Sequence, residues 1–235
     1  MSRIKLFCVP YAGASAMVYS KWKKGLAEFI ELHGIELPGR GRRFSDPYCN
    51  SVEEVVEDIL KCIKNEVTDG CKYAFFGHSM GTLIVYELTN RIKELCNNSP
   101  VHVFFSGRNS PDKKVESKVI HTLPDNEFKY ELNKFGGIPK KIFENSELAK
   151  VFLPILRADY KLIDTYNYNQ VKNKLDSNIT ILYGTDDSYI KYDIGSWKDF
   201  TTKQCEIIPY HGGHFFISDY MKEVIKVIND TLAVY

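Results

Sequence analysis

No stretch of this 235-residue sequence is apolar for long enough to cross a membrane. A spanning helix needs about 18 consecutive apolar residues, and no window here approaches that length. The N-terminal residues carry charges and contain too short an apolar run for an export signal. We therefore expect a cytoplasmic protein that has no membrane partner.

A large excess of charge of either sign is also missing. The 31 lysines and arginines are balanced by 30 aspartates and glutamates, which leaves a net charge of +1. Proteins that bind nucleic acid or anionic lipid over a broad surface usually carry a strong positive excess. The balance argues against nucleic acid as a partner, although a local basic patch is compatible with it.

Metal-binding and disulfide patterns are missing as well. The six cysteines form no Cys-x-x-Cys pair, and none stands at the spacing from histidine that zinc sites use. The loop 9–15 lacks both G-x-G-x-x-G and the lysine of a phosphate-binding loop. We therefore interpret the cysteines as reduced thiols and expect neither a metal nor a cofactor.

Repeats, low-complexity tracts and long linkers are absent too, so residues 1–235 are expected to form a single domain. Short apolar runs alternate with stretches of helical periodicity. The runs predict strands at 4–9, 34–37, 73–76, 101–105, 179–183 and 206–208, and the periodic stretches predict helices at 16–30, 51–67, 80–96 and 217–232. Ser51 and Glu54 form a capping signal before the clearest of these helices. This order predicts an α/β fold in which helices cover both faces of a mostly parallel sheet.

One segment interrupts the alternation. About 70 residues separate the strands expected at 101–105 and 179–183, and they show helical patterns, such as Glu147 to Leu162, rather than a strand. A crossover between parallel strands needs far fewer residues. We predict a helical insertion over about residues 111–175 that covers the sheet as a lid.

The stretch Gly77-His78-Ser79-Met80-Gly81 matches G-x-S-x-G and lies between an expected strand and an expected helix. A nucleophilic serine must stand clear of the backbone, and a tight strand-to-helix turn exposes it when glycines flank it. The backbone amide of Met80 would then open the helix and face a developing oxyanion. We predict Ser79 as the nucleophile, and a purely structural turn of small residues is the alternative.

A serine hydroxyl needs a base to act as a nucleophile. His214 is favoured because glycines precede it in the loop after the last expected strand and the final helix follows it. His211, three residues earlier, is the alternative. His78 is bound into the turn beside Ser79, so we expect it to make local polar contacts at the edge of the site.

The base in turn needs a carboxylate that fixes its tautomer and stabilises its protonated form. Asp186 and Asp187 both follow the strand expected at 179–183, and the Gly-x-x-Asp spacing favours Asp187. The order Ser79, Asp187, His214 along the chain is that of the α/β-hydrolases.

A second donor to the oxyanion is expected from the loop after the first strand. Val9 to Ser15 is a loop of mostly small residues between a strand and a helix. The backbone N–H of Ala12 is our candidate for the partner of the Met80 amide, and that of Tyr11 is the alternative.

Together these motifs resemble the type II thioesterases of non-ribosomal peptide and polyketide synthesis, a family of α/β-hydrolases. The resemblance runs over nearly the whole chain and is carried by the stretches 7–13, 36–43 ("ELPGRGRR"), 76–81, 106–108, 153–160 and 212–216. Two positions depart from the family pattern. Ala14 stands where a second glycine is usual, and Ser188 follows Asp187 where a proline is usual.

The resemblance implies an editing enzyme that hydrolyses acyl or aminoacyl thioesters on the phosphopantetheine arm of carrier-protein domains. It implies a serine acyl-enzyme mechanism, transient binding of the carrier protein, and a monomer. The chain begins at Met1 and ends just after its last expected helix, which favours a free-standing protein. The alternatives are a fatty-acyl thioesterase, a general carboxylesterase, and an inactive hydrolase fold that binds a synthase as a scaffold.

Two groups of residues near the expected site have competing interpretations. Arg40, Arg42 and Arg43 could attract an acidic carrier domain, or they could bond backbone carbonyls around the nearby Pro-Gly turn, which we favour. The aromatic residues of the insertion could line an acyl channel or pack as core, and their helical spacing favours core. They are Phe135, Phe143, Phe152, Tyr160, Tyr166 and Tyr168.

Overall fold

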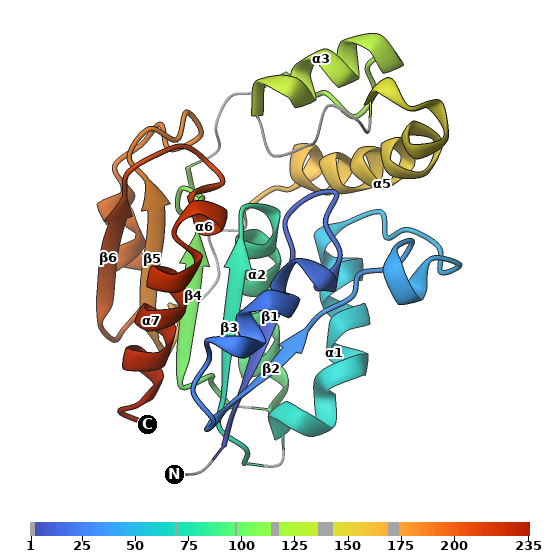
Figure 1. The fold of residues 1–235 in the computed structure, drawn as a ribbon. Coiled ribbons are helices and arrows are strands. Elements are labelled where there is room, and N and C mark those ends of the chain that lie inside the picture. Colours follow the sequence, from blue (N-terminus) through green and yellow to red (C-terminus); the bar gives the residue numbers. More distant parts are fainter. Residues whose placement is uncertain (1–2, 69, 97, 114–117, 136–142, 169–173) are drawn as a thin grey trace.

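The computed structural model describes residues 3–68, 70–96, 98–113, 118–135, 143–168 and 174–235 (Figure 1). In this part of the chain, six parallel strands form one sheet in the order β2-β1-β3-β4-β5-β6. The strands are β1 (Ile4–Val9), β2 (Ile30–Gly34), β3 (Tyr73–His78), β4 (His102–Ser106), β5 (Asn178–Gly184) and β6 (Cys205–Tyr210). All six carboxyl ends therefore meet at one edge of the sheet, where the loops that carry chemistry are expected.

Helices cover both faces of this sheet, as predicted (Figure 1). One layer contains α1 (Val52–Thr68), α2 (Met80–Cys96) and η3 (Ile194–Phe200), and the other contains η1 (Ala16–Lys24), α6 (Phe216–Asp219) and α7 (Met221–Leu232). Alternate side chains of a strand point to opposite layers, so Phe7 packs with the first and Leu6 with the second. Within the described residues, no helix combines the length and the hydropathy that crossing a bilayer requires.

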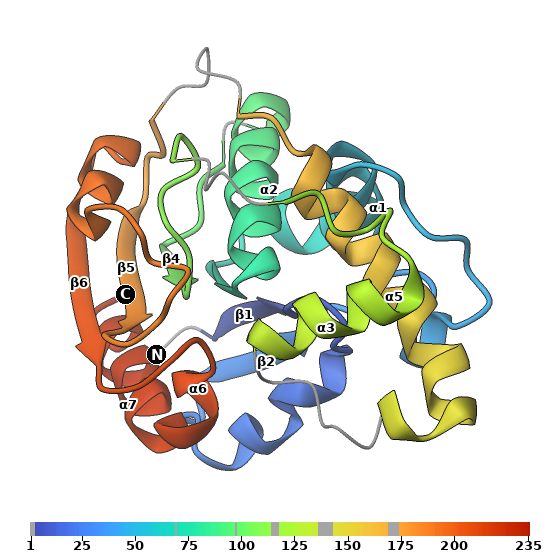
Figure 2. The same cartoon turned by 90° about the horizontal axis from the view of Figure 1, so that it is seen from above.

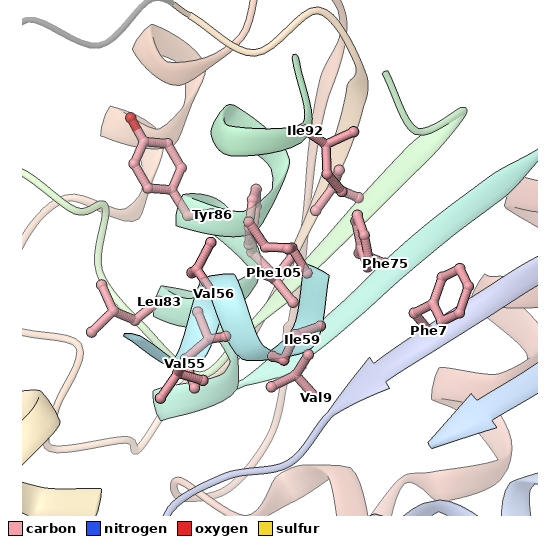
Figure 3. Packing of buried hydrophobic residues seen from close by; sticks show 14 of the residues in the cluster. Phe7, Val9, Val55, Val56, Ile59, Phe75, Leu83, Tyr86, Ile92 and Phe105 are labelled. Carbon is pink, nitrogen blue, oxygen red and sulfur yellow. The ribbon is translucent and has the colours of Figure 1, made fainter. Parts of the chain in front are cut away.

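Helix α1 shows how the sequence pattern becomes packing. Its apolar residues recur on one face and are buried, and in Figure 3 Val55 lies near Leu83 of α2 and Ile59 near Val9 of β1. The hydroxyl of Ser51 accepts the N–H of Glu54 at 3.2 Å, so the capping signal acts as predicted. Each fully buried aliphatic side chain of this kind stabilises the fold by about 1.5–3 kcal/mol.

Three predicted elements differ from the structure. The helix expected at 16–30 is the 3-10 helix η1, which ends at Lys24 because Gly25 caps it and residues 30–34 are needed as β2 beside β1. The strand expected at 34–37 is misplaced, since the chain pairs with β1 over Ile30–Gly34 and then leaves the sheet. The last helix is broken into α6 and α7 at Tyr220, whose ψ of 32° is not helical.

Between β4 and β5 the described residues form α3 (Asp125–Phe135) and α5 (Ser146–Thr165) and no strand. Both helices lie over the carboxyl edge of the sheet (Figures 1 and 2). They share a small apolar core of their own, which we call the lid core, built from Ile120, Phe128, Leu132, Ala149, Leu153 and Leu156. The predicted insertion over about 111–175 includes residues 114–117, 136–142 and 169–173, which lie outside the described part of the chain.

Candidate active site

Ser79 stands at a sharp turn between β3 and α2. Its φ of 55° makes it the one residue other than glycine in the described chain with a left-handed backbone. Glycine is required on either side because the chain is crowded there: a Cβ atom at Gly77 would lie 2.3 Å from the carbonyl oxygen of Gly81, and one at Gly81 would lie 2.3 Å from that of Val9. The turn therefore exposes the serine in the way that G-x-S-x-G predicts.

Thr82 braces this turn, and sequence reasoning missed it. Its Oγ1 accepts the backbone N–H of Ser106 at 3.0 Å and lies 2.7 Å from the carbonyl oxygen of Gly77. The N–H of Ser79 donates to the carbonyl oxygen of Ser106 at 2.8 Å. The end of β4 thus holds both sides of the turn, a contact that depends on tertiary structure and leaves no local signal in the sequence.

His214 reaches Ser79 from the loop between β6 and α6. Its Nε2 lies 2.9 Å from Ser79 Oγ, and its Nδ1 lies 2.7 Å from Asp187 Oδ2. A carboxylate only accepts hydrogen bonds, so Nδ1 carries the proton and Nε2 is free to accept the serine hydroxyl. The structure thereby brings together Ser79, Asp187 and His214, the three side chains predicted to act together.

Asp187, and not Asp186, is the carboxylate beside the imidazole. The Asp187 side chain is fully buried, and its Oδ1 accepts the backbone N–H of Tyr189 at 2.8 Å. Asp186 is 59% exposed and lies 3.4 Å from His211, which is itself 85% exposed. The two alternatives left open by the sequence, Asp186 and His211, face each other at the surface and away from Ser79.

The loops that carry Asp187 and His214 touch because of Gly184. A Cβ atom at this position would lie 2.4 Å from the carbonyl oxygens of both Gly212 and Gly213. The N–H of Asp186 also donates to the carbonyl oxygen of Gly212 at 2.9 Å. The absence of a side chain at the end of β5 therefore lets the histidine loop approach the acid loop.

His78 is buried beneath the site, whereas we expected it at the edge. It is fully buried, its ring lies 5.1 Å from that of His214, and its Nδ1 is 2.9 Å from Ser106 Oγ. Burial, together with the nearby His214, holds the pKa of His78 well below its ordinary value, so it remains neutral. A second positive charge next to a protonated His214 is thereby avoided.

The loop after β1 lies beside this serine turn. Tyr11 to Ala14 forms a tight turn in which the N–H of Ala14 donates to the carbonyl oxygen of Tyr11 at 3.0 Å and Gly13 has a φ of 78°. The first turn of α2 touches the same loop, since Gly81 closely approaches the Val9 carbonyl. Met80 is the first residue of α2, so its amide has no helical partner. Ala12 and Met80 remain our candidates for the oxyanion donors.

The sequence model of the thioesterase domain family matches residues 4–232. The chain belongs to the thioesterase family. It is therefore a hydrolase that acts on thioesters, and its fold is that of the α/β-hydrolases.

Relatives of this thioesterase share most of its length. Gramicidin S biosynthesis protein GrsT of Aneurinibacillus migulanus is 32% identical over 96% of this chain and 87% of its own. The medium-chain S-acyl fatty acid synthase thioesterase of Homo sapiens is 33% identical over 92% of this chain and 81% of its own. The crystal structure of ClbQ from the colibactin NRPS/PKS pathway superposes with a TM-score of 0.93 at 34% identity, over 99% of this chain and 98% of that one.

Two of the three arginines in "LPGRGRR" have structural partners in the thioesterase. Arg43 binds both carboxylate oxygens of Asp58, at 2.6 and 2.8 Å, and donates to the Glu36 carbonyl. Arg40 is buried against the carboxylate of Asp159. The structural interpretation is therefore right for these two, although carboxylates contribute more than backbone carbonyls, while Arg42 is exposed.

The aromatic residues of the insertion are mostly part of packed layers. Phe143 and Tyr160 pack against the lid core, and Tyr166 and Tyr168 pack against the core under α1 and α2. Phe152 is half-buried, and the side chain of Phe135 lies outside the described residues. The interpretation as core holds for the four residues whose packing is known.

Proposed function

We propose that this thioesterase removes acyl or aminoacyl groups from the phosphopantetheine arm of carrier-protein domains of non-ribosomal peptide and polyketide synthases, as a free-standing editing enzyme. The main observation in support is that His214 lies between Ser79 and a buried Asp187. Similarity to ClbQ over 99% of the chain supports the choice of substrate, because ClbQ comes from an NRPS/PKS pathway.

The first half of the reaction acylates Ser79. His214 Nε2 takes the hydroxyl proton as Oγ attacks the thioester carbonyl carbon, and Asp187 stabilises the imidazolium that forms. The negative charge that develops on the carbonyl oxygen rests on the backbone N–H groups of Met80 and Ala12. The carbon–sulfur bond then breaks, and His214 returns its proton to the leaving thiolate.

The second half releases the acid. His214 accepts a proton from a water molecule, which attacks the acyl carbon, and the same two N–H groups hold the second oxyanion. The ester bond to Ser79 breaks, and the serine oxygen regains a proton from His214. Every proton transfer uses a side chain of this protein, so we propose that no resident cofactor takes part.

The carrier protein is the proposed partner, and it binds transiently to a monomer. Carrier domains are commonly acidic around the arm, so basic side chains near the entrance would speed the encounter. Arg40 and Arg43 each form an ion pair with a carboxylate of the same chain, so Arg42 is the arginine of that stretch left for this role. Monomeric state and cytoplasmic location stay predictions.

One assay tests the substrate class. The same acetyl group is offered on a purified carrier-protein domain, on N-acetylcysteamine and on p-nitrophenol, with a Ser79→Ala variant as the blank. We expect kcat/KM to be highest for the carrier-bound thioester and the blank to be inactive. Equal or faster turnover of the oxygen ester would reject the proposal in favour of a general esterase.

Fatty-acyl hydrolysis is the second candidate, because the human medium-chain fatty acid synthase thioesterase is 33% identical. The same carrier protein loaded with acetyl, octanoyl and dodecanoyl groups separates the two. An editing enzyme should accept the short group at least as well as the longer ones. A steep rise in kcat/KM with chain length would favour the second candidate.

A further inference from the structure

A buried carboxylate outside the triad is bound to the loop after β1. Asp159 of α5 is 1% exposed. Its Oδ2 accepts the backbone N–H of Gly13 at 2.7 Å and one guanidinium N–H of Arg40 at 2.6 Å, while its Oδ1 accepts a second Arg40 N–H at 2.6 Å. Both oxygens of Asp159 are therefore used by segments more than a hundred residues away in the chain.

The same loop rests on α5 through a second side chain. A Cβ atom at Gly13 would lie 2.5 Å from Cδ2 of Leu156, one helical turn before Asp159. Arg40 also donates to the carbonyl oxygen of Ala14 at 3.2 Å. The turn Tyr11–Ala14 is thus held by Asp159 at the Gly13 N–H, by Arg40 at the Ala14 carbonyl and by the side chain of Leu156. Figure 1 shows this loop reaching the underside of α5.

The turn depends on these contacts because glycine restrains its own backbone poorly. Gly13 lies in the left-handed region, which glycine enters and leaves at little cost. A hydrogen bond to a carboxylate is roughly twice as strong as one between neutral groups, so Asp159 can fix the turn where the Gly13 backbone cannot. An oxyanion donor must stand within about 2.7–3.1 Å of the charge, which leaves little tolerance for movement.

We propose that Asp159 is a positioning residue for the oxyanion hole. Through Gly13 it fixes the turn that contains Ala12, and so it sets where the Ala12 amide points; this rests on the role given to Ala12 in the proposed function. Leu153 and Leu156 of the same helix build the lid core with α3. One helix therefore supports both the lid and the second oxyanion donor.

The test compares Asp159→Ala and Asp159→Asn with a matched control, Asp58→Ala. Asp58 binds Arg43 through two N–H groups, as Asp159 binds Arg40, but Arg43 lies outside the turn Tyr11–Ala14. For each variant, kcat and KM are measured on the p-nitrophenyl ester and the N-acetylcysteamine thioester, per site titrated with a fluorophosphonate. The inhibition constant of phenylboronic acid, which forms a tetrahedral adduct on the serine, is measured beside them, with thermal unfolding as the fold control.

We expect Asp159→Ala to lower kcat by about 10²-fold, the effect of losing one oxyanion donor. KM should stay within about threefold of the wild-type value, and boronic acid should bind more weakly by about the same factor as the loss in kcat. The pH profile of kcat/KM should not move, because Asp159 contacts Gly13 and Arg40 and no member of the triad. Asp159→Asn keeps only a neutral oxygen for Gly13, whose hydrogen bond is about half as strong, so it should still lower kcat and boronic acid affinity by about tenfold. Asp58→Ala should match the wild type in kcat and in boronic acid affinity.

A residue that only stabilises the fold would give a different result. If Asp159→Ala, or Asp159→Asn where the alanine variant does not fold, lowers thermal stability but keeps kcat per titrated site and boronic acid affinity, the inference is wrong. Boronic acid affinity and turnover of the p-nitrophenyl ester both depend on Ser79 and the oxyanion donors, and neither requires a carrier protein. A wild type inactive on carrier proteins would therefore reject the proposed function and leave this inference standing.

Discussion

Asp186 and Asp187 are neighbours in the chain but have different surroundings. Asp187 is enclosed, accepts the N–H of Tyr189 and pairs with His214, whereas Asp186 points to solvent beside His211. A carboxylate stabilises an imidazolium far more when water is excluded from the pair. The contribution of each residue to catalysis should therefore differ sharply.

We expect Asp187→Asn to lower kcat by roughly 10⁴-fold, because an amide at this position no longer enforces the tautomer that leaves Nε2 free for Ser79. Asp186→Asn should change kcat by less than about twofold. Steady-state kinetics of the two folded variants decide the matter. Loss of activity in the Asp186 variant alone would contradict the assignment.

At this scale the sequence predicted what short motifs encode. Ser79 and His214 follow from a glycine-flanked turn and a glycine-rich loop, and the structure places them in contact. The choice between adjacent aspartates depends on the direction of one turn, and the spacing suggested it without settling it. The burial of His78 and the hydrogen bond from Gly13 to Asp159 both depend on segments distant in the chain, so no local sequence pattern predicts them.

Strand ends carry the machinery at the scale of elements. Ser79 follows β3, Asp187 follows β5 and His214 follows β6, and the parallel sheet brings these ends to one edge. The approach of the last two loops depends on Gly184. The spacing of these loops should therefore respond to a single added methyl group.

We expect Gly184→Ala to cost about 1–3 kcal/mol of folding free energy, as overpacking does. It should also lower kcat at least tenfold, because the added Cβ pushes the histidine loop away from Asp187. Chemical denaturation and steady-state kinetics measure the two effects. Gly213→Ala is the control for stability, since no atom beyond its two chain neighbours in the described residues lies within 4 Å of its added Cβ. Equal destabilisation of both variants would argue against this explanation.

Regular periodicity made most elements predictable, and irregular ones were missed. Helix α1 and helix α2 carry long amphipathic or apolar patterns, and both were found to within a residue or two. The edge strand β2 was misplaced because Ile35 and Leu37 continue an alternating apolar pattern past Gly34, where pairing with β1 ends. The break at Tyr220 depends on backbone geometry that no residue type there demands.

The molecule as a whole should lose stability in mild acid through its buried histidines. His102 of β4 is buried against Thr180 and Tyr235, and burial lowers its pKa to about 4. An unfolded histidine has a pKa of about 6.5, so below that pH the unfolded chain binds a proton that the folded chain does not. Stability is therefore unaffected by His102 above about pH 6.5 and falls as pH drops from there to about 4.

We expect the free energy of unfolding to fall by up to about 1.4 kcal/mol per pH unit for His102 over that window. A His102→Gln variant keeps a side-chain amide near Thr180 and removes the titration, so its stability should depend less steeply on pH. Urea denaturation of both proteins at pH 7, 6 and 5 gives the comparison. Parallel pH dependences would show that His102 does not contribute.

The two duties of α5 set a boundary for protein engineering. Its early residues, such as Ala149 and Leu153, belong to the lid core. Leu156 belongs to the lid core and also meets the turn after β1, and Asp159 binds that turn. A chimaera that borrows the lid of a relative should therefore change helix before Leu156 and keep the native sequence from there to Thr165. A chimaera joined after Asp159 would replace the contact that holds the turn Tyr11–Ala14 as well as the lid.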